Sequence, residues 1–105
     1  MADFKEINPE EVEQMRTQAT VLLVDIRDID AYETAHIPQA VTLSDKNIKE
    51  FLQITDKKKQ IICYCYHGIS SQSAAHYLVQ QGFESVYSIR GGFEAWRQVY
   101  PEKAV

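Results

Sequence analysis

The sequence has few of the residues that mark three common classes of protein. It contains only two cysteines, too few for the disulfide framework of a small secreted domain. Its longest apolar stretches, VLLV at 21–24 and IICYCY at 61–66, are far shorter than the roughly 20 residues that cross a bilayer. The net charge is −4, and the basic residues are scattered except for the lysines at 57–59. We therefore expect no membrane-bound part and no nucleic-acid surface.

The N-terminal stretch and the two cysteines predict where the protein resides and whether its thiols are reduced. The N-terminal stretch MADFKEINPEEVEQM lacks the basic segment and apolar run of a secretion signal, so we expect a cytoplasmic protein. One residue separates Cys63 from Cys65 on an extended segment, and this spacing does not suit a structural disulfide. Both cysteines are expected to be reduced.

Strand and helix patterns alternate along the chain. The 105 residues suit one domain, predicted to span 1–105. Asn8, with Glu11 three residues later, signals a helix start, Ser44 is expected to cap another helix, and Gly82 to follow the end of a third. Strands are predicted at 4–7, 21–26, 41–43, 61–65 and 85–89, and helices at 9–16, 28–34, 45–54, 70–81 and 93–99. The continuously apolar strands predict an α/β fold, with a mostly parallel sheet covered by helices on both faces.

Cys65 ends the second of these apolar strands, where open α/β sheets bind their ligands. The loop after it leads into the first turn of a predicted helix, so backbone N–H groups are expected to point at the sulfur and stabilise a thiolate. Gly68 allows a tight loop, and Ser70 and Ser71 add hydroxyl donors. We call residues 66–71 the anion-binding loop.

The anion-binding loop lacks the cation that phosphate chemistry prefers. No lysine or arginine occurs from Tyr66 to Ile89, and the sixth residue after Cys65 is Ser71 rather than arginine. A cysteine phosphatase needs a guanidinium for the phosphoryl oxygens, so the sequence disfavours a phosphatase.

Four motifs in order along the chain resemble the rhodanese family. CYHGISS at 65–71 resembles its active-site loop, LLVDIRD at 22–28 its N-terminal signature, AHIPQA at 35–40 its Gly-His-Ile-Pro-Gly-Ala segment, and YSIRGGFEAW at 87–96 its C-terminal segment. Ordered matches of this kind are more specific than a lone cysteine.

The resemblance implies a rhodanese-like fold and a sulfurtransferase reaction. Cys65 would be the catalytic residue, taking the sulfane sulfur of thiosulfate as a persulfide, releasing sulfite, and passing the sulfur to cyanide or to a dithiol protein such as thioredoxin. It implies no cofactor and no metal, and we expect a monomer or weak dimer. The substrate-binding residues would be those of the loop: Tyr66, His67, Gly68, Ile69, Ser70 and Ser71.

Two other functions stay open beside this one. A non-catalytic rhodanese-like module that binds or regulates partners is the main alternative, although an intact cysteine loop speaks against it. A metal site built from Cys63, Cys65 and His67 lacks the usual ligand number and spacing. Cys63 is expected to pack in the core, with sulfur exchange between the two cysteines as a lesser possibility.

Departures from the family pattern give further expectations. Many rhodaneses have a basic residue where this loop has Ile69 and Ser70, so we hypothesise that Arg90 supplies a positive charge at the mouth of the site. Ala35 and Gln39 stand where the family usually has glycine, which is expected to alter a surface turn. Other expectations concern structure alone. Asp25 and Arg27 are expected to form a structural pair, and Phe93 and Trp96 are expected to lie in the core.

Overall fold

Five parallel strands form the sheet at the centre of the molecule. The computed structural model describes residues 3–105, so the first two residues of the predicted 1–105 domain lie outside the described part. The sheet order is β1-β5-β4-β2-β3, and every neighbouring pair is parallel. The strands are β1 (Lys5–Ile7), β2 (Val21–Asp25), β3 (Val41–Thr42), β4 (Gln60–Tyr64) and β5 (Ser85–Ile89). The predicted α/β class is confirmed, with a sheet that is parallel throughout.

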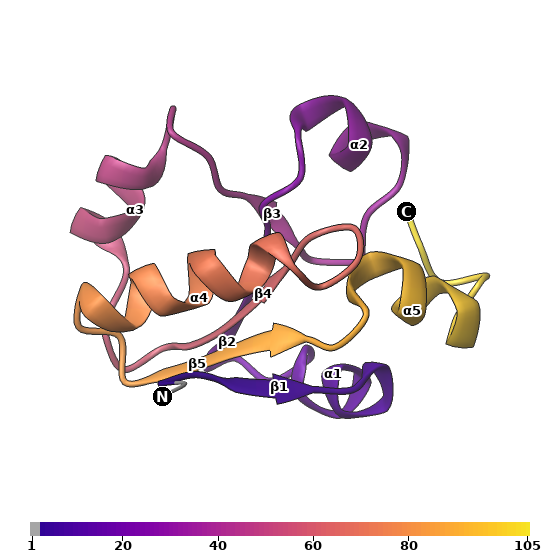
Figure 1. Ribbon diagram of the computed structural model, residues 1–105, viewed down its shortest axis with the longest axis horizontal. Helices are drawn as coiled ribbons and strands as arrows, with labels where there is room; N and C mark the ends of the chain where they lie inside the picture. The colour runs from indigo at the N-terminus through magenta and orange to yellow at the C-terminus, as the bar shows by residue number, and fades with distance from the viewer. Residues whose placement is uncertain (1–2) are drawn as a thin grey trace.

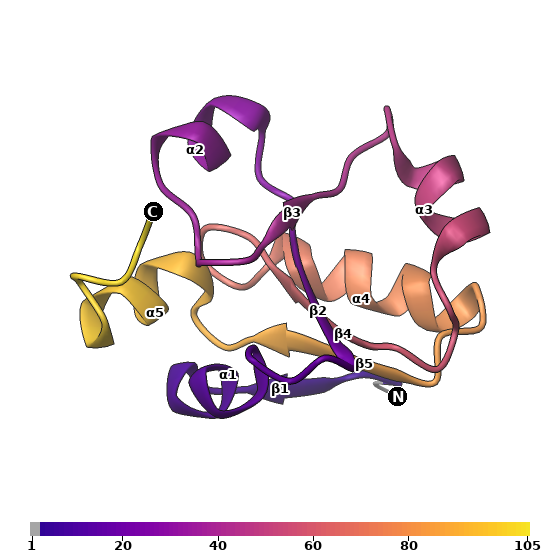
Figure 2. The ribbon, with the colours of Figure 1, turned by 180° about the vertical axis from the view of Figure 1, so that it is seen from behind.

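Helices cover both faces of this sheet, as Figures 1 and 2 show from opposite sides. Side chains of α1 (Pro9–Met15) and α5 (Gly92–Val99) join one buried cluster, to which α2 (Ile29–Thr34) adds the partly buried Tyr32. Side chains of α3 (Ile48–Ile54) and α4 (Ser70–Gln80) join the other. Trp96 and Phe93 of α5 are at most 1% exposed, so their prediction as core is confirmed.

The central strand β4 is buried on both faces. Ile62 and Tyr64 belong to the cluster under α1 and α5, whereas Ile61 and Cys63 belong to the cluster under α3 and α4. Successive side chains of a strand point to opposite faces, and both faces here are apolar. This burial explains the unbroken apolar run of the sequence.

Two of the three predicted helix boundaries are confirmed. The Asn8 side chain accepts a hydrogen bond from Glu11 N at 2.9 Å, and the Glu11 carboxylate accepts one from Asn8 N at 3.0 Å. This reciprocal pair is the capping box that the sequence predicts. Gly82 follows Gln81, the C-cap residue of α4, and has φ of +102°, a left-handed conformation that glycine adopts without steric cost.

The prediction that Ser44 caps a helix at 45–54 is wrong, because α3 begins only at Ile48. The side chain of Asn47 accepts a hydrogen bond from Ser44 N at 2.8 Å and donates one to Thr42 O at 2.8 Å. Ser44 Oγ accepts from Lys46 N at 3.2 Å. These local bonds hold residues 44–47 in a turn, which competes with the first helical turn.

The helices were also compared with the requirements for a membrane span. Among residues 3–105, none of the helices has both the length and the apolar character that crossing a bilayer requires.

Candidate active site

Cys65 is the first residue after β4, one position beyond the strand, although the sequence predicts it within the strand. It sits at the carboxyl end of the central strand and is 7% exposed. Residues 66–69 then turn the chain into α4, which begins at Ser70. A reagent must therefore reach the sulfur through the mouth of this loop, which favours a small reactant.

The sulfur of Cys65 accepts hydrogen bonds from the loop and from the first turn of α4. Gly68 N donates to Sγ at 3.1 Å and Ser71 N at 3.3 Å. The Ser71 hydroxyl oxygen lies 3.4 Å from Sγ within hydrogen-bonding geometry. The N-cap residue Ile69 makes no side-chain capping bond, so the cysteine sulfur serves as the acceptor that a capping side chain normally provides.

This environment lowers the pKa of Cys65 below the ordinary thiol value. Burial opposes the lowering, but the Ser71 hydroxyl and the amides of Ser71, Gly68 and His67 together outweigh it by bonding to the charged form. Cys63 differs, because burial and the nearby Cys65 raise its pKa to about 12. The two thiols are unbonded to each other, and only Cys65 lies in surroundings that favour a thiolate.

The first turn of α5 holds the other side of the loop. Phe93 N donates to Cys65 O at 2.9 Å, and Glu94 N donates to Tyr66 O at 3.0 Å. With both carbonyls bound to α5, the amides of the loop are free to face the sulfur. The sequence pattern did not predict these donors, although the Gly91-Gly92 pair before an aromatic residue is a signal of close backbone approach.

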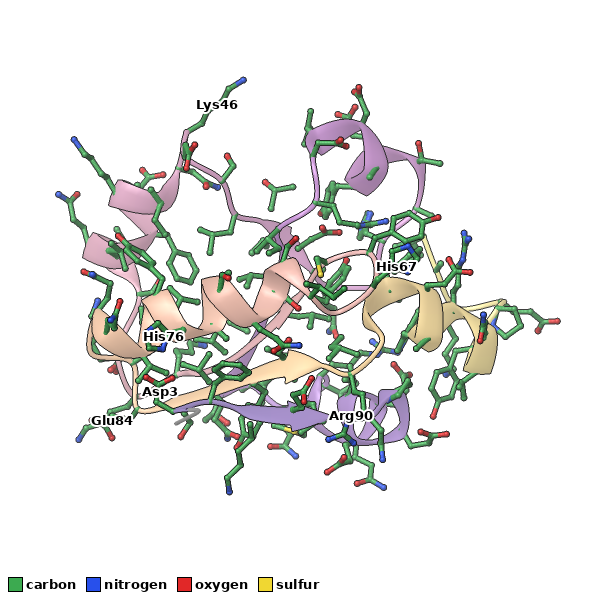
Figure 3. All side chains as sticks on the ribbon, viewed as in Figure 1. Asp3, Lys46, His67, His76, Glu84 and Arg90 are labelled. Atoms are coloured by element: carbon green, nitrogen blue, oxygen red, sulfur yellow. The ribbon has the colours of Figure 1, made fainter. Side chains whose placement is uncertain are left out.

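The six loop residues divide into those that reach the sulfur and those that face solvent. Gly68 and Ser71 are buried against Cys65, and the His67 amide contributes to the same site. In contrast, the side chains of Tyr66, His67, Ile69 and Ser70 are exposed. Figure 3 shows His67 beside the beginning of α5, at the rim of the loop. Of the two serines expected to add hydroxyl donors to the loop, Ser71 lies at hydrogen-bonding distance from Cys65 Sγ, and Ser70 is exposed.

Comparison with known proteins agrees with the sequence motifs. Residues 8–99 match the family described as Rhodanese-like domain. The chain belongs to the rhodanese family. This rhodanese is 50% identical over 105 residues to "Thiosulfate sulfurtransferase GlpE" of Pseudomonas syringae pv. syringae, covering 100% of this chain and 98% of the relative. It is 44% identical over 98 residues to the protein of the same name from Coxiella burnetii, covering 93% of this chain and 92% of the relative.

Solved structures give the same fold for this rhodanese. A rhodanese-related protein from Thermoplasma volcanium superposes with a TM-score of 0.79 over 97% of this chain and 98% of that chain. Its sequence is only 19% identical, so the likeness concerns the fold alone.

A buried ion pair lies at the carboxyl end of β2, and its arginine lines the same cleft as Tyr66 of the loop. Arg27 Nη2 donates to Asp25 Oδ2 at 2.7 Å and to Ala35 O at 2.6 Å. Burial opposes the charge on Arg27, but the hydrogen bonds and charge of Asp25 outweigh it and raise the pKa of Arg27. Its guanidinium lies 4.2 Å from the centre of the Phe93 ring. The predicted structural pair of Asp25 and Arg27 is therefore confirmed.

Arg97 contacts the loop, whereas Arg90 lies apart from it. Arg97 Nη2 donates to the Tyr66 hydroxyl at 3.2 Å and pairs with Glu94 at 2.7 Å. Figure 3 shows Arg90 beside β1 and α1, well apart from His67 at the loop. Arg97, Tyr66 and Arg27 also line a cleft of about 230 Å³ beside the loop. The sequence did not point to Arg97, because this residue comes close to Tyr66 only when α5 folds against the loop.

Proposed function

We propose that this protein transfers sulfane sulfur through a persulfide on Cys65. Its enzyme class is that of its full-length relatives, thiosulfate sulfurtransferase. The Cys65 thiolate attacks the outer sulfur of thiosulfate and forms a new S–S bond. The old S–S bond of thiosulfate breaks, and sulfite leaves with its electron pair. Splitting the transfer into two displacements is the advantage of a covalent intermediate.

The second displacement regenerates the thiolate. Cyanide attacks the outer sulfur of the persulfide, thiocyanate leaves, and the bonding electrons return to Cys65. A dithiol protein such as thioredoxin is the acceptor we propose in the cytoplasm, where thiols are kept reduced. One of its thiolates takes the sulfur, and its second thiol then displaces hydrogen sulfide and closes a disulfide. We expect the protein to act as a monomer or weak dimer.

The observation that carries this proposal is the set of hydrogen-bond donors around Cys65 Sγ. The donors are the Gly68 and Ser71 amides, the Ser71 hydroxyl and the His67 amide. Neutral donors that are already in place stabilise a negative sulfur without reorganisation during the reaction. We infer that the loop from Tyr66 to Ser71 binds the anions in turn: thiolate, persulfide and departing sulfite.

Intact mass spectrometry tests the proposal directly. The protein is incubated with thiosulfate, and a mass gain of one sulfur atom is expected, together with free sulfite. Adding cyanide should remove the gain and produce thiocyanate. Cys65→Ser should show neither, whereas Cys63→Ser, the matched control, should still take up one sulfur. A native protein that gains no sulfur and releases no sulfite would reject this function and favour the non-catalytic module.

A further inference from the structure

Ser88 is a buried hydroxyl in an otherwise apolar stretch of the core. It lies on β5 directly opposite Cys63 of β4 and is 0% exposed. Val86, which points to the same face of β5, belongs to the cluster under α3 and α4. A hydroxyl at such a place is costly unless it is hydrogen bonded, so its partner indicates what it does there.

The partner of Ser88 is the serine that bonds to the cysteine. Ser88 Oγ lies 2.7 Å from Ser71 Oγ, which in turn lies 3.4 Å from Cys65 Sγ. Ser71 is also 0% exposed. Three groups from β5, α4 and the end of β4 thus form one buried hydrogen-bonded chain.

A chain of two hydroxyl groups can carry its protons in two directions. When Cys65 is a thiol, its S–H can donate to Ser71 Oγ, and Ser71 then donates to Ser88. When Cys65 is a thiolate, Ser71 must donate to the sulfur, and its oxygen is left to accept a proton from Ser88. Each bond of such a chain polarises and strengthens the next.

We propose that Ser88 is a positioning residue, which donates its hydroxyl proton to Ser71 Oγ and thereby directs the Ser71 hydroxyl proton toward Cys65 Sγ. Ser88 acts through Ser71 and does not touch the sulfur. This inference rests on the proposed role of Cys65 as the nucleophile. Its measurable consequence is thiolate formation, which is separate from sulfur transfer.

The substitution that tests the proposal alters no charge around Cys65. The charged and titratable groups on the surrounding elements are unchanged in Ser88→Ala, so a change in thiolate formation reports the hydroxyl chain. They are Cys63 and Tyr64 on β4, Asp25 at the end of β2 and Arg27 after it, His67 in the loop, Glu94 and Arg97 on α5, His76 and Tyr77 on α4, Tyr87 and Arg90 at β5, and Lys5 and Glu6 on β1.

The experiment measures the rate of alkylation of Cys65 by iodoacetamide across pH, in the Cys63→Ala background, which places no new hydroxyl opposite Ser88. For Ser88→Ala we expect the rate below the pKa to fall about two- to threefold, because one cooperative bond is lost. At high pH, where the thiolate is complete, the rate should equal that of the parent. Ser71→Ala should lower the rate more, by about tenfold, because it removes a direct bond to the charge.

The double variant Ser71→Ala/Ser88→Ala decides between positioning and a general structural role. If Ser88 acts through Ser71, the double variant has the same profile as Ser71→Ala alone. Ser85→Ala, at the opposite end of the same strand, is the matched control and should leave the profile unchanged. The proposal is overturned if Ser88→Ala leaves the profile unchanged. It is also overturned if Ser88→Ala lowers the rate equally in both backgrounds, or lowers the plateau at high pH.

Failure of this inference is distinguishable from failure of the proposed function. Sulfur uptake from thiosulfate with an unaltered alkylation profile in Ser88→Ala would reject the positioning role alone. Absence of sulfur uptake in the native protein would reject the function, whatever the alkylation profile shows.

Discussion

Gly92 and the Cys65 carbonyl are so close that no side chain fits between them. A Cβ atom on residue 92 would lie 2.6 Å from Cys65 O, 2.6 Å from Tyr66 O and 2.7 Å from Gly68 N. Gly92 also has φ of +64°, a conformation that disfavours other residues. The start of α5 can therefore approach the loop and bind its carbonyls only because residue 92 is glycine.

Replacing this glycine should disturb the site as well as the fold. We expect Gly92→Ala to push α5 away from the loop, to slow alkylation of Cys65 by about tenfold or more, and to cost roughly 1–3 kcal/mol in unfolding free energy. Urea unfolding and iodoacetamide kinetics measure the two effects.

Gly82→Ala is the control for backbone strain without crowding. Gly82 has φ of +102°, but the nearest atoms to a Cβ there are those of the Lys57 side chain, at 3.9 Å or more. The Gly82→Ala variant should lose about 1 kcal/mol of unfolding free energy and keep the native alkylation rate of Cys65. Equal alkylation rates in the two glycine variants would contradict the contact argument.

The two cysteines should react at different pH values. Because the pKa of Cys65 is lowered, its alkylation should reach half its maximal rate below about pH 8.5, the ordinary thiol value. Cys63, with a pKa raised to about 12, should stay unmodified until the protein unfolds. Mass spectrometry should count one alkylated cysteine in the native protein and two in urea. Two modified cysteines in the native state would contradict the prediction.

Stability should follow the same shift in pKa. A thiolate favoured by folding adds stability that is fully present above the unfolded-state pKa of about 8.5. That stability is lost as pH falls through the lower folded-state pKa of Cys65. The difference in unfolding free energy between the parent and Cys65→Ser should therefore increase with pH across this window. A difference independent of pH would contradict the sign.

Local signals in the sequence predicted much of the fold. The capping box at Asn8 and the glycine beyond α4 depend on residues a few positions apart, and both are confirmed. The unbroken apolar run at 61–65 predicted a buried strand of a parallel sheet, with Cys65 at its carboxyl end. The prediction that Ser44 caps a helix was wrong for a local reason too, because the Asn47 side chain, three residues later, bonds to the backbone of the same turn.

The missed parts of the site are contacts between distant segments. Ser88 lies 17 residues after Ser71, and its hydroxyl looks like any strand serine until the two elements pack together. The amides of Phe93 and Glu94 carry no side-chain signature at all. Arg97 was overlooked for a similar reason, because only the packing of α5 brings it to Tyr66.

Substituting Arg97 tests whether this residue, rather than Arg90, assists the capture of thiosulfate. Its side chain is 44% exposed and is partly neutralised by Glu94, so we expect a modest effect on anion capture. Arg97→Ala should raise KM for thiosulfate about two- to fivefold, weaken its salt dependence and leave kcat nearly unchanged.

Arg90→Ala is the matched control for this test and should leave KM unchanged. Steady-state kinetics at low and high salt measure both variants. A raised KM in Arg90→Ala, with none in Arg97→Ala, would restore the hypothesis drawn from the sequence.

Gln39 keeps a backbone conformation that suits the glycine usual in its family. Its φ is +75°, which costs a residue with a side chain about 1–2 kcal/mol. The exposed Gln39 side chain accepts a hydrogen bond from Arg16 Nη1 at 3.2 Å, and a solvent-exposed bond of this kind recovers little of that cost. We therefore expect Gln39→Gly to stabilise the protein by about 0.5–1 kcal/mol in urea unfolding.

Ala35 is the comparison for this substitution. It also stands where the family usually has glycine, but its φ of −166° and ψ of 138° are ordinary extended values. Ala35→Gly should therefore destabilise the protein by about 0.5–1 kcal/mol. Changes of the same sign at both positions would show that backbone conformation is not the cause.

The place of β4 in the middle of the sheet also bears on when the site is lost. Edge strands β1 and β3 can open without breaking the bonds of β4 to its neighbours β2 and β5. Amide protons of a central strand exchange with solvent mainly through global unfolding, whereas edges exchange through smaller openings. Cys65 follows the strand expected to exchange most slowly, so the nucleophile should keep its position through the partial openings that release the periphery.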